Sequence, residues 1–198
     1  MAASKDLVFT QGKTFTLALR WETIPIIYKP ITGITATAPV RLTVVGHGCP
    51  DGWRAAVTGV KGMSEINGEA NKLKDTDYHI VTVIDVDTIE FNEVNAAGFK
   101  AYVSGGHLQF NTPVDLAGAT ARMTVKDKVG GRVLHSLTTE NGGIAIDPAA
   151  YSITLNISAT DTETFAWKGG VYDLEVVQGA VVTALLAGKV TVSKEVTT

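Results

Sequence analysis

Cysteine is almost absent from this chain: Cys49 is the single one among 198 residues. One thiol cannot form a disulfide within the chain, so the fold does not depend on an oxidising compartment and we expect it to form in a cytoplasm. Long apolar runs are absent as well. The longest nearly apolar stretch, Ala180 to Ala187, is far shorter than the roughly 20 residues that cross a bilayer, and residues 1–6 carry no apolar signal region. We therefore predict no membrane partner.

Charge is sparse and balanced. Charged residues make up 19% of the chain, the net charge is −3, and no basic run is present. Proteins that grip a nucleic-acid backbone rely on clustered lysine and arginine, so nucleic acid is not an expected partner. Hydrophobic residues make up 45%, which is ordinary for a globular protein and argues against disorder.

Two segments far apart in the sequence alternate apolar and polar residues with a period of two. Such a period indicates a strand with one buried and one solvated face. The buried faces are Phe15, Leu17, Leu19 and Trp21 in the first segment, and Ala119, Ala121, Met123 and Val125 in the second. Because a lone hairpin cannot shelter such a face, we predict that Phe15, Leu17 and Leu19 share one core with Met123, Leu155 and Leu174.

The remaining pattern also predicts strands, with turn signals every eight to twelve residues and no sustained helical period. A short helical turn is expected at 161–166, with Thr160 or Asp161 as its cap. Between Pro30 and Gly106 the texture changes to short strands and frequent glycines, after Pro25 and Pro30 interrupt the strand pattern. Phe99 to Val103 is predicted as the strand that closes this middle region.

We therefore predict an all-β fold with two domains. Residues 1–29 and 107–198 would form a discontinuous antiparallel β-sandwich, and residues 30–106 would form a small inserted β-barrel-like module.

Candidate metal ligands are few. His47 and Cys49 lie two residues apart, and three more side chains could be imagined around them: Asp51, His79 and His107. Zinc sites usually show two paired ligand clusters at set spacing, and only one weak pair is present. The favoured interpretation is a glycine-rich turn whose histidine bonds the backbone.

Asp85 and Asp87 flank a tight turn. Paired carboxylates can perform acid–base chemistry or hold a cation, but aspartate is also favoured in turns for local hydrogen bonding, and we favour the turn. No Gly-x-Ser-x-Gly elbow precedes a helix, and the glycine pairs punctuate hairpins. No catalytic residue, cofactor or metal ligand is predicted.

A possible contact patch for a partner consists of aromatic residues and a methionine in the middle region: Trp53, Met63, Phe99 and Tyr102. In a module this small, such residues more often form the core, so core and interface roles both stay open.

Four segments outside the middle region carry a family resemblance: Asp6–Gly12, Val114–Met123, Gly170–Glu175 and Leu186–Val192. Together they resemble a β-sandwich common in tailed-phage virion proteins, similar to the N-terminal domain of upper baseplate proteins. That domain sits on the virion body and carries receptor-binding parts, so the resemblance implies a structural role in the particle.

The middle region has a resemblance of its own, carried by Gly46–Gly48, Val57–Asn67, Asp87–Phe91 and Gly98–Gly106. It is similar to a small β-module of phage tail proteins whose fold resembles the first catalytic cysteine half-domain (FCCH) of ubiquitin-activating enzymes. The resemblance implies no ubiquitin chemistry, because no nucleotide-binding glycine loop accompanies it. The polar loop Gly68–Asp77 is longer than that module's usual connections.

These resemblances lead us to expect a non-enzymatic structural protein of a tailed-phage virion, assembled in the host cytoplasm. It would be a homo-oligomer in the tail, neck or baseplate, joining other virion proteins such as fibres. A capsid decoration protein is the main alternative. A module that binds a host glycan by stacking Trp53 or Tyr102 on sugar rings is another, and an enzyme on a β scaffold is a weaker one.

Overall fold

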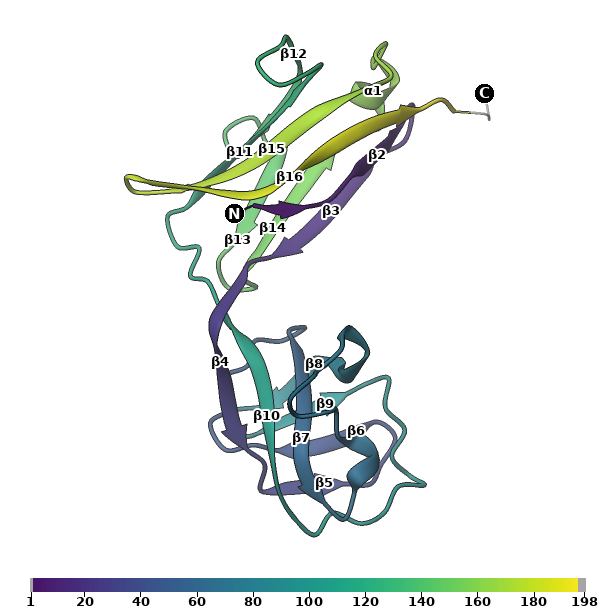
Figure 1. Ribbon diagram of the computed structural model, residues 1–198, viewed down its shortest axis with the longest axis vertical. Helices are drawn as coiled ribbons and strands as arrows, with labels where there is room; N and C mark the ends of the chain where they lie inside the picture. The colour runs from purple at the N-terminus through teal and green to yellow at the C-terminus, as the bar shows by residue number, and fades with distance from the viewer. Residues whose placement is uncertain (1, 196–198) are drawn as a thin grey trace. The chain divides into compact units, whose positions relative to one another are not determined.

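The computed structural model describes residues 2–195 as an all-β protein with three mostly antiparallel sheets and one short α-helix (Figure 1). The chain divides into two compact units. Unit 1 comprises residues 2–21 and 113–195 of the described chain, and unit 2 comprises Glu22–Thr112.

Unit 1 contains two sheets. One has the strand order β1-β16-β15-β11-β12, with β2 also paired to β16, and the other has the order β13-β14-β3. The elements are β1 (Ala3–Ser4), β2 (Leu7–Thr10), β3 (Phe15–Arg20), β11 (Thr120–Lys126), β12 (Val133–Thr138), β13 (Ile144–Asp147), β14 (Ser152–Ile157), α1 (Ala159–Glu163), β15 (Gly169–Gln178) and β16 (Val181–Ser193).

The inner faces of these two sheets share one hydrophobic cluster. Met123, Leu155 and Leu174 are buried in this cluster, and Phe15, Leu17 and Leu19 pack against it. The predicted sharing of one core by the two distant segments is therefore confirmed. Full burial of residues such as Leu155 stabilises the fold by roughly 1.5–3 kcal/mol each.

The N-terminal strands lie along the free side of the last strand. β1 and β2 both pair with β16 in parallel, with Ala3 opposite Leu186 and Leu7 opposite Val190. Between them, the Tyr172 hydroxyl donates a hydrogen bond of 2.7 Å to the Lys5 carbonyl. Burial raises the pKa of Tyr172 to about 12, so the phenol keeps its proton and remains a donor.

The helix begins earlier than predicted. α1 spans Ala159–Glu163, and its N-cap is Ser158 rather than Thr160 or Asp161. The Ser158 hydroxyl accepts a hydrogen bond of 3.0 Å from the Asp161 N–H. Ser158 directly follows the end of β14, so it is the first residue free to satisfy an unpaired N–H of the helix.

Unit 2 contains the third sheet, with the order β4-β10-β7-β8-β9-β6-β5. Its elements are β4 (Glu22–Pro30), β5 (Gly33–Thr35), β6 (Val40–Thr43), β7 (Arg54–Lys61), two 3-10 turns at Ser64–Ile66 and Asp75–Asp77, β8 (Tyr78–Asp85), β9 (Thr88–Phe91) and β10 (Ser104–Pro113). The predicted barrel does not close, because within the described residues β4 and β5 remain edges of an open sheet.

The prolines explain this open sheet and correct a prediction. β4 runs through both Pro25 and Pro30 instead of being interrupted by them. Proline is tolerated in a strand whose N–H side is unpaired, so an edge strand is the place where both fit. The same missing donors disfavour the extra pairing that barrel closure would require.

The predicted closing strand at Phe99–Val103 is wrong. These residues lie outside the strands, and the next strand, β10, begins at Ser104. The reason is visible in the spacing: Phe99 and Tyr102 are three residues apart, whereas a strand needs a period of two.

In the sequence, one unit passes into the other at Trp21/Glu22 and Thr112/Pro113, and not at the predicted boundaries 29/30 and 106/107. The shift arises because β4 and β10 pair with each other inside the sheet of unit 2. The Thr112 hydroxyl, for example, donates a hydrogen bond of 2.6 Å to the Pro25 carbonyl.

Removing unit 2 should leave a folded remnant. The Val114 N–H donates a hydrogen bond of 3.0 Å to the Trp21 carbonyl, so the two cut ends of unit 1 lie close together. We expect a chain that lacks residues 22–112 and carries a short glycine linker to retain a cooperative transition, measured by thermal unfolding monitored by circular dichroism. A remnant that melts without cooperativity would contradict the division into units.

Candidate functional site

The four residues of the predicted contact patch divide into two groups. Trp53 and Met63 are buried, at 1% and 0% exposure, and the Trp53 Nε1–H donates a hydrogen bond of 3.1 Å to the Asn111 carbonyl. Phe99 and Tyr102 are half-buried. Trp53 and Met63 therefore belong to the core of unit 2, and the contact role stays a prediction for Phe99 and Tyr102.

The Tyr102 hydroxyl is already engaged by its own unit. It lies 3.0 Å from the Ile31 carbonyl and 3.2 Å from the Gly105 carbonyl, and it can donate its single proton to one of them. The side chain thus ties the segment before β10 to the end of β4, with part of its ring left exposed.

His47 bonds the backbone of its turn, as the favoured interpretation predicts. Its Nδ1 accepts a hydrogen bond of 3.0 Å from the Cys49 N–H, and its Nε2 lies 2.9 Å from the Asp85 carbonyl. An Nδ1 that accepts requires the proton on Nε2, which then donates to Asp85. Both ring nitrogens are occupied in this arrangement, and neither is left for a metal ion.

The other candidate ligands do not join His47. His79 Nδ1 lies 3.2 Å from the Glu93 carboxylate, and His107 is exposed on β10. Within residues 2–195, no three His, Cys, Asp or Glu side chains gather closely enough to hold a metal ion.

The two turn aspartates act locally. The Asp85 carboxylate accepts a hydrogen bond of 2.9 Å from the Asp87 N–H, and Asp87 accepts one of 2.7 Å from the Gly46 N–H. The first bond, with those from Thr88, holds the pKa of Asp85 below its usual value. These contacts confirm the turn interpretation, in which each carboxylate fixes a loop.

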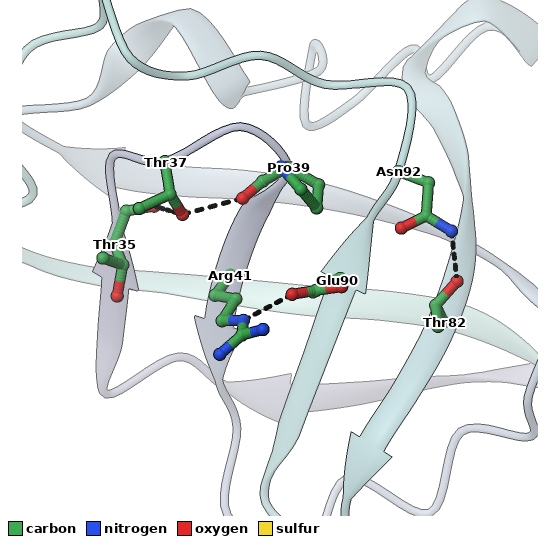
Figure 2. A network of polar contacts seen from close by, with 7 residues as sticks. All are labelled: Thr35, Thr37, Pro39, Arg41, Thr82, Glu90 and Asn92. Carbon is green, nitrogen blue, oxygen red and sulfur yellow. Dashed lines mark hydrogen bonds and ion pairs between the residues drawn. The ribbon is translucent and has the colours of Figure 1, made fainter.

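A polar row crosses the outer face of the unit 2 sheet (Figure 2). Arg41 on β6 lies opposite Glu90 on β9, and Glu90 lies opposite Thr82 on β8. The Arg41 Nε–H donates to the Glu90 carboxylate, which is buried, while the Arg41 side chain is 54% exposed. The ion pair thus joins β6 and β9 at the position where Arg41 and Glu90 lie opposite each other in the register.

Thr37 stabilises the loop between β5 and β6, which lies beside this row. The Thr37 hydroxyl lies 2.7 Å from the Pro39 carbonyl and 3.3 Å from the Thr35 carbonyl, as Figure 2 shows. A hollow of about 280 Å³ lies between this loop and Arg41. The Glu90 carboxylate in its lining is paired with Arg41, and the Thr37 hydroxyl bonds its own loop, so the more exposed charged group of the hollow is the Arg41 guanidinium.

A hollow of about 520 Å³ in unit 1 lies where β12, β14 and α1 meet. Several of its polar side chains are bonded within the unit. The Ser158 hydroxyl donates a hydrogen bond of 2.6 Å to Asp161, the Asn141 side chain bonds its own turn, and the Asn156 Oδ1 accepts from the Thr16 hydroxyl at 3.0 Å. These groups stabilise loops and do not converge on a common point.

His135 lines this hollow and was missed by the sequence analysis. Its Nε2 is the one buried side-chain polar atom without a hydrogen-bond partner in the part of the chain that the structure describes. The ring meets Phe165 edge-on, with centroids 4.9 Å apart. The sequence could have indicated that His135 faces inward, because it lies two residues from Leu137 on the same face of β12, and Leu137 is buried.

Comparison with protein-family models finds no match to this chain, and comparison with curated proteins finds none either. No helix in residues 2–195 is long and apolar enough to span a membrane.

The stability of unit 1 should fall in mild acid because of His135. Burial lowers the pKa of His135 below its ordinary value of 6.5, with a smaller opposing effect from Asp161. The fold therefore favours the neutral ring, and this stabilisation is present above pH 6.5 and is lost as the pH falls through the folded-state pKa. We expect His135→Phe to flatten the dependence of the unfolding free energy on pH, measured by urea denaturation between neutral and mildly acidic pH.

The matched control is His107→Phe, because His107 is exposed. It should leave the slope of stability against pH unchanged. An equal flattening in both variants would show that burial of His135 is not the cause.

Trp53→Ala should destabilise unit 2 by about 3–5 kcal/mol, because it removes the largest fully buried side chain and leaves a cavity. Phe99→Ala, at a half-buried position, should cost clearly less. Denaturant unfolding followed by circular dichroism measures both losses, and equal losses would contradict the assignment of Trp53 to the core.

Proposed function

We propose that this chain is a non-enzymatic structural protein of a tailed-phage virion. Unit 1 would be a discontinuous antiparallel β-sandwich of the upper-baseplate type, and unit 2 an inserted module similar to the FCCH fold. Many copies would assemble in the tail, neck or baseplate and join neighbouring virion proteins such as fibres.

The observation that carries the proposal is where the resembling segments lie. Asp6–Gly12 contains β2, Val114–Met123 leads into β11, Gly170–Glu175 lies in β15 and Leu186–Val192 lies in β16. These four segments are distant in sequence, yet their strands are neighbours in the order β2-β16-β15-β11. A resemblance carried by scattered turn and core residues thus falls on one continuous sheet.

The chain path supports an insertion. The chain leaves unit 1 after Trp21, runs along β4, and returns along β10 to Pro113, and β4 and β10 are hydrogen-bonded neighbours (Figure 1). An inserted module that begins and ends on adjacent strands adds a second binding surface without disturbing the host core. A protein that connects components of a particle needs two such surfaces.

The internal bonding of the polar groups also supports a structural role. Five polar side chains form hydrogen bonds within turns or at a helix cap: His47, Asp85, Asp87, Asn141 and Ser158. Catalysis and ligand binding require convergent groups that are free to meet a substrate, whereas assembly requires rigid loops and exposed strand edges.

The test uses particles from the source phage or prophage that carry an epitope tag on this chain. We expect the tagged chain to co-purify with isolated tails and to appear at the tail, neck or baseplate when labelled particles are imaged. Co-purification with emptied heads would instead identify a capsid decoration protein, and absence from purified particles would overturn the proposal.

A further inference from the structure

The exposed edges of the three sheets differ in how well they can accept another strand. An edge strand presents unpaired N–H and C=O groups, and proteins usually block long edges. The edge strands within the described residues are β1 and β2, β12, β13, β3, β4 and β5.

β12 is blocked by a side chain. The Asn141 Oδ1 accepts a hydrogen bond of 2.8 Å from the Thr138 N–H, and its Nδ2–H donates one of 3.1 Å to the Ser136 carbonyl. Asn141 thus occupies one N–H and one carbonyl on the open side of β12, so an added strand could not pair along its full length.

The other edges are interrupted or short. β4 contains Pro25 and Pro30, which lack N–H donors. β5 has three residues, β13 and β2 have four each, and β1 has two. None of them offers a long uninterrupted row of donors and acceptors.

β3 is different, because it is six residues long and pairs on one side only, with β14. The Asn156 N–H donates to the Gly143 carbonyl, so Asn156 and Thr154 direct their backbone groups toward β13. Ile153, Leu155 and Ile157 then direct theirs toward β3.

The β14–β3 register fixes which groups of β3 are left over. Leu155 lies opposite Leu17 and Ile153 lies opposite Leu19, so Leu17 and Leu19 use their backbone groups on β14. The backbone groups of Thr16 and Ala18 consequently point to the open edge, and both residues are exposed.

The inner face of β3 is also incompletely covered. Phe15, Leu17 and Leu19 are half-buried, whereas their neighbours on β14, Ile153, Leu155 and Ile157, are 0%, 0% and 1% exposed. One more strand beside β3 would cover this apolar face while it satisfies the free backbone groups.

We propose that the added strand is β3 of a second copy of this chain, paired antiparallel about a twofold axis. The two three-stranded sheets would then continue into each other. This inference goes beyond the proposed function and holds for the isolated chain, whatever particle it belongs to.

The sequence of β3 is complementary to itself in this arrangement. The backbone groups on the open edge of β3 belong to even-numbered residues. In a twofold antiparallel pair, each even-numbered residue therefore lies opposite an even-numbered residue of the second copy, and each odd-numbered residue opposite an odd-numbered one. Centred on Ala18, it sets Leu17 against Leu19 and Thr16 against Arg20 of the second copy. Centred on Leu17, it sets Phe15 against Leu19 and Thr16 against Ala18. Both keep apolar side chains on one face and place no like charges opposite each other.

The experiment measures sedimentation of the full chain over a concentration series, together with amide hydrogen exchange. We expect a monomer–dimer equilibrium, with the Thr16 and Ala18 N–H groups protected at high concentration and exchanging rapidly on dilution. Ala18→Lys should raise the dimer dissociation constant at least about tenfold, since symmetry brings two lysines to the contact.

The matched control is Ala145→Lys, which places the same substitution at an exposed alanine on β13, the other edge of the same sheet. It should leave the dissociation constant unchanged. A wild-type chain that stays monomeric, a dimer in which Thr16 and Ala18 exchange freely, or equal weakening by both substitutions would each overturn the proposal. The exchange measurement needs no variant, so it decides the question even where Ala18→Lys does not fold.

Discussion

The pairing of β3 with β14 is the contact on which unit 1 depends. It joins residues 15–20 to residues 152–157, with Phe15 opposite Ile157 and Arg20 opposite Ser152. The whole of unit 2 lies between these strands in the sequence. Without this pairing β3 would be detached from the three-stranded sheet. Its neighbours on β14, Ile153, Leu155 and Ile157, would then lose the strand that flanks them. The interruption by unit 2 is tolerated because the energy of this contact comes from local burial and backbone pairing, which do not require the strands to be close in sequence.

Much of the fold could be predicted because buried strands leave a period of two. Ala121, Met123 and Val125 on β11 and Tyr172, Leu174 and Val176 on β15 are all buried, as their alternation indicates. Edge strands were harder to predict, because a strand that pairs on one side only places fewer constraints on its residues. Pro25 and Pro30 forbid a central strand but permit an edge strand, and only the structure shows that β4 is an edge. The open sheet of unit 2 was missed for the same reason.

Candidate site residues were harder to judge because the same side chains serve chemistry and turns. The His47 and Asp85 interpretations could be weighed correctly from their glycine-rich surroundings, since short polar side chains in turns usually bond the backbone. Trp53 and Met63 could not be separated from Phe99 and Tyr102 by type alone, because all four lie outside the strands and their exposure depends on how their loops pack. His135 was overlooked although its strand position marked it as inward-facing, because a single histidine carries no motif.

The parallel strands at the N-terminus set the order in which the protein can form during synthesis. Asp6 accepts a hydrogen bond from the Lys189 N–H, a partner 183 residues later in the chain. A ribosome therefore releases β1, β2 and β3 long before β14 and β16 exist, whereas every strand of the β4–β10 sheet emerges within one continuous stretch. The inserted unit can complete its sheet first, while the earliest strands of the outer unit remain unpaired, with Phe9 and Phe15 exposed to solvent. Synthesis of β16, not emergence of the first strands, is the event that allows the outer unit to close its core.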